Sequence, residues 1–226
     1  RYWKFDYPVR LGSSFGVEDA PRSGPVIDGD LVFVVGVRGD LHCLDLKSGA
    51  LVWKKNLEKD YGPAPLFFGR GGCPLVHGDQ IIVNVGGKIC VAGFNKRTGR
   101  LLWSTKHNWH ASYASPVPAT LHGRERVLVF TGGMVDPPTG GLLSIDPRNG
   151  KVDDAFPWRA RMFASVNASS PVPVGNAVFV TESYTEGGAL VDFQADGKAR
   201  LRWKAERFGS QFTTPVAHEG YLYGVD

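Results

Sequence analysis

The stretch Cys43-Leu-Asp45-Leu-Lys-Ser48-Gly49-Ala-Leu-Val-Trp53 decides the fold, because Gly93-Phe-Asn95-Lys-Arg-Thr98-Gly99-Arg-Leu-Leu-Trp103 repeats it 50 residues later. Its Asp or Asn can accept hydrogen bonds from the turn backbone, its Ser or Thr adds a hydroxyl, and its Gly supplies the left-handed residue that closes a hairpin. We expect each Trp to pack on the small residue, Cys43 or Gly93, that opens the motif in the neighbouring unit.

The same spacing extends along most of the chain. Tryptophan recurs at Trp3, Trp53, Trp103, Trp158 and Trp203, and a proline followed by an apolar residue opens each unit, at Pro25, Pro74, Pro116, Pro171 and Pro215. Between these landmarks, short alternating apolar runs are separated by turns rich in Gly, Asp and Asn. The pattern predicts a repeated blade of four antiparallel strands.

The predicted fold class is therefore all-β, a β-propeller with about four and a half blades present in one continuous region, residues 1–226. Expected blades cover 1–6 (last strand only), 20–57, 70–106, 112–160, 167–206 and 211–226 (first strands only). Tyr2-Trp3-Lys4-Phe5 is expected to be an outermost strand. We interpret the whole as a partial ring of a seven- or eight-bladed propeller.

Composition supports this fold and narrows the function. The 226 residues include 29 Gly and 15 Pro, which favour turns over a helical bundle. The net charge of +4 is small and scattered, so we expect no nucleic-acid partner. No apolar run is long enough to be a transmembrane segment. The three cysteines, Cys43, Cys73 and Cys90, lack zinc or disulfide spacing, so we expect buried thiols.

The signature Asp-x-x-Ser/Thr-Gly-x-x-x-Trp resembles the tryptophan-docking motif of the pyrroloquinoline-quinone (PQQ) type propeller repeat. That family includes quinoprotein dehydrogenases and the cofactor-free outer-membrane assembly lipoprotein. The match is looser in Ser144–Gly150, where Trp158 comes four residues late, and in Asp192–Trp203. The segments 112–117, 156–161 and 165–171 look like bacterial exported PQQ-binding-like propellers. The resemblance implies a periplasmic or secreted location.

In this architecture, side chains just before each innermost strand reach the mouth of the central funnel. These candidate ligand-binding residues are Arg22, Arg70, His110, Tyr113, Arg159, Arg161, Asn167 and Gln211, with Ser112, Glu18, Asp19 and His107 nearby. Arginine suits a carboxylate or phosphate ligand, although loop Arg and Asn side chains can equally satisfy exposed carbonyls. His107-Asn-Trp-His110 lacks further ligands at metal-binding spacing, so no metal site is predicted.

Two functions compete. The preferred hypothesis is a non-catalytic exported scaffold, without catalytic residues or a cofactor, that binds a protein or polysaccharide partner together with the remaining blades of a parent propeller. The alternative is a PQQ- and calcium-dependent oxidoreductase of the alcohol or sugar dehydrogenase type, for which the resemblance makes Asn167 and Glu182 the nearest match to the calcium ligands. The adjacent Cys pair of that family is missing.

Other enzyme classes have less support. A sugar-binding or sugar-cleaving propeller would have Tyr113 and Trp109 as platforms, but no carboxylate pair is evident. The sequence also lacks the phosphate-binding loop, the dinucleotide fingerprint, the nucleophile elbow and the zinc-protease motif. Nucleotide-binding, hydrolase and zinc-protease functions are therefore not expected.

Overall fold

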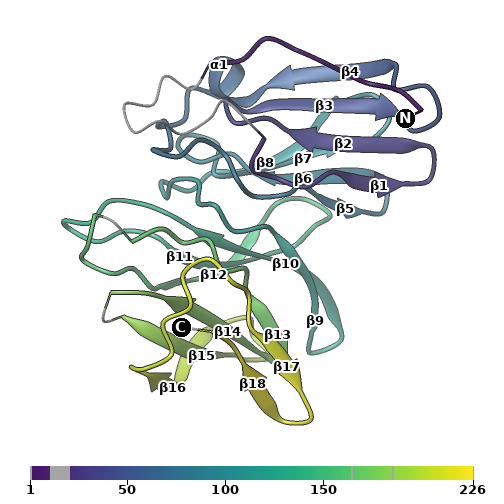
Figure 1. Ribbon diagram of the computed structural model, residues 1–226. Helices are drawn as coiled ribbons and strands as arrows, with labels where there is room; N and C mark the ends of the chain where they lie inside the picture. Colours follow the sequence, from purple (N-terminus) through teal and green to yellow (C-terminus); the bar gives the residue numbers. More distant parts are fainter. Residues whose placement is uncertain (1, 11–20, 164, 185, 226) are drawn as a thin grey trace.

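The computed structural model describes residues 2–10, 21–163, 165–184 and 186–225, and nearly all of its regular structure is β (Figure 1). The strands of the first two sheets are β1 (Val26–Asp28), β2 (Leu31–Val35), β3 (Asp40–Asp45) and β4 (Leu51–Asn56), then β5 (Leu75–His77), β6 (Gln80–Asn84), β7 (Val91–Asn95) and β8 (Leu101–Thr105). Those of the next two are β9 (Val117–Leu121), β10 (Arg124–Thr131), β11 (Gly141–Ile145) and β12 (Val152–Pro157), then β13 (Val172–Val174), β14 (Ala177–Glu182), β15 (Gly187–Phe193) and β16 (Ala199–Ala205). A last pair comprises β17 (Val216–His218) and β18 (Tyr221–Tyr223).

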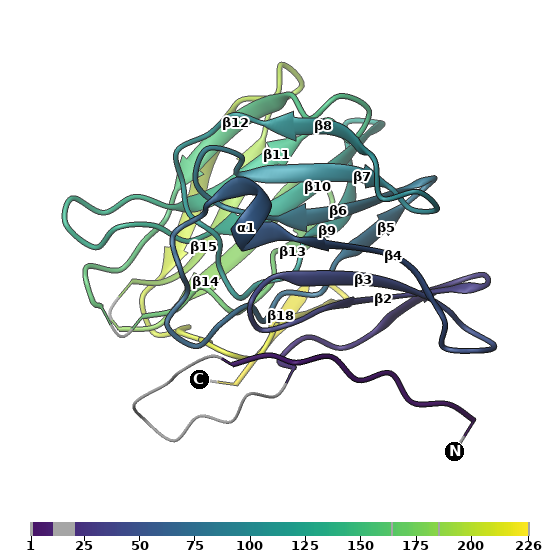
Figure 2. The same cartoon turned by 90° about the horizontal axis from the view of Figure 1, so that it is seen from above.

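Each complete sheet is a four-stranded antiparallel meander with its strands in chain order. Successive sheets lie face to face and fan out from the β1–β4 sheet to the β13–β16 sheet, leaving the fan open (Figures 1 and 2). The predicted all-β class and four-stranded blades are confirmed, and the open fan fits a partial ring.

The hydrophobic core lies between neighbouring sheets. One cluster joins Phe33 and Leu41 of the first sheet to Ile81 and Phe94 of the second. A second cluster joins the β5–β8 and β9–β12 sheets, and a third joins the latter to β13–β16. Because alternate residues of an inner strand point to opposite sheet faces, a blade between two others buries both of its faces.

The hairpin turns form as the sequence predicts. Asp45 accepts hydrogen bonds from the Ser48 backbone N–H (2.7 Å) and hydroxyl (2.6 Å), and Gly49 has φ +73°. In the second copy Asn95 accepts from the Thr98 backbone N–H (2.9 Å) and hydroxyl (3.0 Å). The two bonds from Ser48 hold the pKa of Asp45 below its ordinary value.

The expectation that each tryptophan packs on Cys43 or Gly93 of the neighbouring blade is wrong. The Trp53 indole lies against the turn residue Gly99 of the next sheet, where an added Cβ would be 2.8 Å from the ring, and its Nε1 donates to the Lys96 carbonyl (2.9 Å). The small residues pair within their own sheet, Cys43 with Trp53 and Gly93 with Trp103. The small residue therefore makes room for its own tryptophan, whereas the turn Gly receives the neighbour's.

None of the described residues 2–10 is in a strand, so the outermost strand expected at Tyr2-Trp3-Lys4-Phe5 stays a prediction. Trp3 nevertheless keeps the inter-blade contact: its Nε1 donates to the Leu46 carbonyl (2.8 Å) and its ring lies against Gly49.

A short helix was not foreseen. α1 (Leu57–Tyr61) follows β4; Asn56 caps it by accepting from the Lys59 N–H (2.7 Å), and Gly62 ends it at φ +58°. Within the described residues, no helix is long and apolar enough to cross a membrane.

The cysteine prediction holds for two of the three thiols. Cys43 and Cys90 are buried, and burial raises their pKa values to about 11 and about 12. Cys73 is only half-buried. A buried thiol with so high a pKa is not a reactive thiolate at neutral pH.

Candidate functional site

A cleft with a volume of about 570 Å³ opens among the loops that join successive sheets. The loop before β5, the loop between β8 and β9, the β10–β11 loop and the loops around β13, β14 and β17 all contribute to it. Its apolar wall is formed by exposed or partly exposed side chains: Phe67, Phe68, Met134, Phe163, Tyr184 and Phe212. We call this region the aromatic cleft.

The aromatic cleft exposes far more apolar surface than a solitary surface residue would. Phe163 is 77% exposed and Phe212 is 72% exposed, and Met134 is 53% exposed on the β10–β11 loop. Contiguous exposed apolar surface framed by polar groups is typical of interaction sites. The geometry therefore favours binding of an apolar partner surface.

The predicted mouth residues divide into two groups. Those that line the aromatic cleft are His110, Tyr113, Arg159, Asn167 and Gln211, and Ser112 lies beside them. Arg22, Arg70 and Arg161 are not among its lining residues. Glu18 and Asp19 lie outside the described residues.

Arg22 and Arg70 both bond to backbone carbonyls. Arg22 Nε donates to the Phe68 carbonyl (2.6 Å) on the cleft wall. Arg70 is 4% exposed, and its Nη1 and Nη2 donate to the carbonyls of Asn84 (3.1 Å) and Val85 (2.9 Å) at the end of β6. Burial lowers the pKa of Arg70. Arg161 is exposed.

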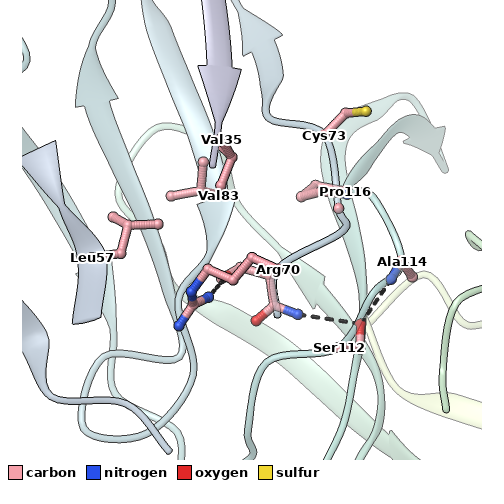
Figure 3. Close-up of a pocket in the computed structure, with 10 residues that line it drawn as sticks. Val35, Leu57, Arg70, Cys73, Val83, Ser112, Ala114 and Pro116 are labelled. Atoms are coloured by element: carbon pink, nitrogen blue, oxygen red, sulfur yellow. Dashed lines mark hydrogen bonds between the residues drawn. The ribbon is translucent and has the colours of Figure 1, made fainter. Parts of the chain in front are cut away.

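Arg70 borders a separate small cavity of about 20 Å³, shown in Figure 3 with Val35, Leu57 and Ser112 around it. This space is large enough for about one water molecule. It does not admit a cofactor or a peptide, so the aromatic cleft is the better candidate for ligand binding.

Tyr113 helps to fix the aromatic wall. Its hydroxyl accepts from the Phe68 N–H (3.1 Å), and the two rings are 6.1 Å apart. Burial raises the pKa of Tyr113. Arg22 and Tyr113 thus hold the Phe68 backbone from two sides.

A buried charge pair adjoins the aromatic cleft through Arg159, which lines it. Glu182, the last residue of β14, is 0% exposed, and the side chain of Arg159 is 8% exposed. Arg159 Nη1 donates to Glu182 Oε1, to Asn167 Oδ1 (3.1 Å) and to the Ser165 carbonyl (3.1 Å). Burial raises the pKa of Glu182, and the Arg159 charge partly opposes this effect.

Both oxygens of Glu182 have further donors. The Ser165 hydroxyl donates to Oε1 (2.7 Å) and the Ala160 N–H donates to Oε2 (2.9 Å). Buried charges are stable only when paired and hydrogen-bonded in this way. We call Arg159, Ser165, Asn167 and Glu182 the charge network.

Asn167 connects this network to the preceding blade. Its Nδ2 donates to the Thr131 carbonyl (2.9 Å) at the end of β10, and its backbone carbonyl accepts from the N–H groups of Tyr113 and Ala114 (both 3.0 Å). The residue is 2% exposed. Its side chain is thus a structural link between blades.

The predicted mouth histidine His107 lies against an aromatic ring. His107 packs edge-on against Trp109 at 4.5 Å, and burial lowers the pKa of His107. Among the residues that the structure describes, no group of three or more His, Cys, Asp or Glu side chains is placed to hold a metal ion.

Sequence reasoning missed two features of the site. Phe67-Phe68, Phe163 and Phe212 lie in loops, outside the alternating strand pattern, and that placement is the signal that could have identified the apolar wall. The pairing of Arg159 with Glu182 joins residues 23 positions apart, so no local motif announces it.

Comparison with known proteins supports the fold and the repeat. The family model described as outer membrane protein assembly factor BamB matches residues 1–226. A quinoprotein ethanol dehydrogenase from Pseudomonas putida is 25% identical over 220 residues, which cover 92% of this chain and 34% of that protein. A tetrathionate hydrolase from Acidithiobacillus ferrooxidans is 26% identical over 147 residues, 64% of this chain and 26% of that protein.

Solved structures show the same fold at low identity. BamB from Moraxella catarrhalis superposes with a TM-score of 0.57 at 19% identity, over 89% of this chain and 54% of that one. The quinohemoprotein alcohol dehydrogenase from Comamonas testosteroni gives a TM-score of 0.60 at 12% identity, over 90% of this chain and 39% of that one. The chain thus spans about a quarter to a third of the curated relatives' length.

Proposed function

Because the chain belongs to the family of PQQ-like propellers described as outer membrane protein assembly factor BamB, we propose that it is a non-catalytic binding module. Its ligand is an apolar segment of a protein partner, which docks in the aromatic cleft. The observation that carries this proposal is the set of exposed rings around a cleft of about 570 Å³.

The energy for such binding comes from burying the exposed rings. Each Phe side chain that passes from water into an apolar contact contributes about 2 to 3 kcal/mol. Phe163 and Phe212, at 77% and 72% exposed, have the most surface to gain. Exposed aromatic side chains at the centre of a contact are the usual origin of binding energy in protein interfaces.

The cleft wall is ordered by bonds within the chain. Phe68 is held by Arg22 and Tyr113, and the 159–167 loop is held by the charge network. A site organised before binding loses less conformational entropy when the partner docks. This supports recognition of a defined segment.

A protein segment suits the cleft better than a polysaccharide. Aromatic rings can serve either ligand, but a sugar polymer also needs many polar partners for its hydroxyls, and the residues that line the cleft are mostly apolar. Binding of a polysaccharide is the competing outcome of the experiment below.

The quinoprotein alternative does not fit the residues present. Asn167 Oδ1 and Glu182 Oε1 both bond to Arg159 Nη1, and Glu182 Oε2 bonds to Ala160 N–H. Asn167 Oδ1 and Glu182 Oε1 are thus occupied by the Arg159 cation, and calcium needs six to eight oxygen ligands. We therefore derive no redox step for this chain.

We further propose that the protein acts outside the cytoplasm. The support is its family, whose description refers to outer-membrane assembly. We propose the same location for the protein partner and for any further blades of the whole propeller.

The experiment removes the apolar wall without touching the blades. In the double variant Phe163→Ser/Phe212→Ser, we expect binding of labelled extended peptides rich in Phe and Val, measured by fluorescence anisotropy, to weaken by at least about tenfold. The matched control is Leu51→Ser/Leu102→Ser, which changes equally apolar side chains, each 43% exposed, on the outer strands β4 and β8.

The two variants separate the outcomes. Loss of peptide binding in the cleft variant alone supports the proposal. Equal affinities in both variants and the unchanged protein would contradict it, as would binding of a polysaccharide in place of every peptide tested.

A further inference from the structure

The outer face of the first sheet is covered by an earlier part of the same chain. Residues 2–10 run along the β1–β4 sheet on the side away from the other sheets (Figure 2). The side chains of Trp3, Phe5, Tyr7 and Val9 are partly buried, whereas the even-numbered residues between them are exposed. One side of the segment therefore faces the sheet along its whole length. We call residues 2–10 the strap.

A histidine lies under the strap. Leu41 and Cys43 of β3 belong to the core shared with the second sheet, so His42 between them points to the opposite, outer face. The centroid of the His42 ring is 5.1 Å from that of Phe5 and 4.4 Å from that of Tyr7. His42 is 4% exposed. The strap thus removes an imidazole from water.

Ring packing, rather than polar bonding, holds the strap at this point. His42 Nδ1 and the Tyr7 hydroxyl are both buried, and neither has a hydrogen-bond partner among the described residues. The Tyr7 hydroxyl lies where a Cβ on Gly36 would be. A buried imidazolium needs acceptors for both of its N–H groups, and the contact offers none to Nδ1. We propose that neutral His42 holds the strap on the outer face of the first sheet, and that protonation of His42 releases it.

The charged groups on the sheet itself act in opposite directions. Val34 on β2 and Lys54 on β4 are the cross-strand neighbours of His42. Burial lowers the pKa of His42 from 6.5; the Asp40 carboxylate opposes this effect, and the Lys54 ammonium adds to it. Because the effect of burial is the largest of these, covering by the strap favours the uncharged imidazole.

The strap contributes no counter-charge to His42. Lys4 and Asp6 form an ion pair with each other (2.5 Å), and their side chains are 58% and 66% exposed. Burial, with a smaller effect of Asp40, raises the pKa of Tyr7. The side chains that cover the imidazole, Phe5 and Tyr7, therefore do not compensate its protonation.

The sign of the pH dependence follows from this arrangement. A histidine whose pKa is lowered by a contact stabilises that contact above its ordinary pKa of 6.5, and the contribution is lost as the pH falls below it. The strap should therefore stay on the sheet at neutral pH and leave it on mild acidification, while the core between the sheets remains folded.

The first test uses linkage between the strap and the imidazole. His42 is titrated by NMR in the unchanged protein, in Tyr7→Ala and in Gly36→Ala, with the exposed His218 as the internal reference. Gly36→Ala displaces the Tyr7 hydroxyl without changing the strap or His42. Both variants leave Asp40 and Lys54 in place. We expect the pKa of His42 to be lowered in the unchanged protein and to rise towards 6.5 in both variants.

The second test measures the strap itself. Hydrogen exchange of residues 2–10 is compared at equal pH in the unchanged protein, in His42→Gln and in the control His218→Gln. Between about pH 7.5 and about pH 5, we expect protection of the strap to fall at least about fivefold in the unchanged protein and in the control. In His42→Gln it should stay constant. If glutamine does not hold the strap at any pH, the titration of His42 decides.

Three results would overturn the proposal. One is a pKa of His42 that is the same in the unchanged protein, in Tyr7→Ala and in Gly36→Ala. Another is protection of the strap that does not change between the two pH values in the unchanged protein. The last is an equal fall of protection in His42→Gln, which would assign the pH dependence to another group.

Discussion

Two regions of the molecule join neighbouring blades, and they do so by different physics. At the outer rim, Trp53 packs on Gly99 and bonds to the Lys96 carbonyl at 2.9 Å. At the mouth, the charge network bonds Arg159 to Glu182, and Asn167 bonds to the preceding blade. The rim contact is built from a short turn motif that recurs, whereas the mouth is built from distant residues.

The difference shows how each region responds to change. The rim spreads inter-blade stability over several similar contacts, at Trp3, Trp53 and Trp103. The mouth concentrates it in a single buried ion pair whose partners depend on each other. Substitutions at the rim should therefore have graded effects, while the mouth should respond sharply to loss of one charge.

The largest expected effect is at the mouth. Glu182→Gln leaves the Arg159 guanidinium buried without its counter-charge and should lower the free energy of unfolding by about 3 to 5 kcal/mol. Urea unfolding measures the change. If Glu182→Gln lowers the free energy of unfolding no more than the exposed control Glu219→Gln, the claim that the mouth depends on one ion pair is wrong.

The rim tryptophans should differ according to their burial. Trp103 is 8% exposed, so Trp103→Ala should cost about 3 to 5 kcal/mol through the cavity it leaves. Trp203 is 39% exposed, and Trp203→Ala should cost about half as much. Equal losses in urea unfolding would show that neighbour packing does not set the cost.

The turn glycines provide a finer test of the rim. Gly99→Ala places a Cβ 2.8 Å from the Trp53 ring at φ +68°. Gly78→Ala meets similar backbone strain at φ +57° with nothing within 4 Å. Both should lose about 1 to 2 kcal/mol to backbone strain, and Gly99→Ala about 1 to 3 kcal/mol more to overpacking. Equal losses of stability for Gly99→Ala and Gly78→Ala in thermal unfolding would show that contact with Trp53 does not constrain Gly99.

The smallest expected effect is a pH dependence at a third turn. Bonds from Arg148 lower the pKa of Asp146 from 3.8 to about 2. A lowered carboxyl pKa stabilises the fold above pH 3.8, and this contribution is lost as the pH falls towards 2. The unfolding temperatures of the unchanged protein and Asp146→Asn should therefore converge near pH 2. A constant difference from pH 5 to pH 2 would contradict the assignment.

The rim was predictable because its information is local. Asp45, Ser48 and Gly49 define their turn within five residues, and the recurrence of that pattern revealed the blades. The tryptophan partner was misassigned because cross-strand pairing places Cys43 beside Trp53 within one sheet, which spacing alone does not distinguish from contact with a neighbour.

The mouth was predictable only in part. The position just before each innermost strand placed Tyr113 and Asn167 at the predicted mouth, and both line one cleft together with Arg159; that they bind a ligand stays a prediction. That position did not distinguish side chains that face the cleft from Arg70, whose guanidinium turns inward to β6 carbonyls. Nor does loop sequence reveal which aromatic rings are left exposed, because that depends on how the loops of different blades meet.

The most direct test of the central claim is calorimetric titration of PQQ with calcium into the protein. Because Arg159 already occupies the Asn167 and Glu182 oxygens, a binding module of this kind predicts no saturable heat from a well-folded sample. Saturable, calcium-dependent binding that is lost in Asn167→Ala would contradict the account and establish a quinoprotein site in its place.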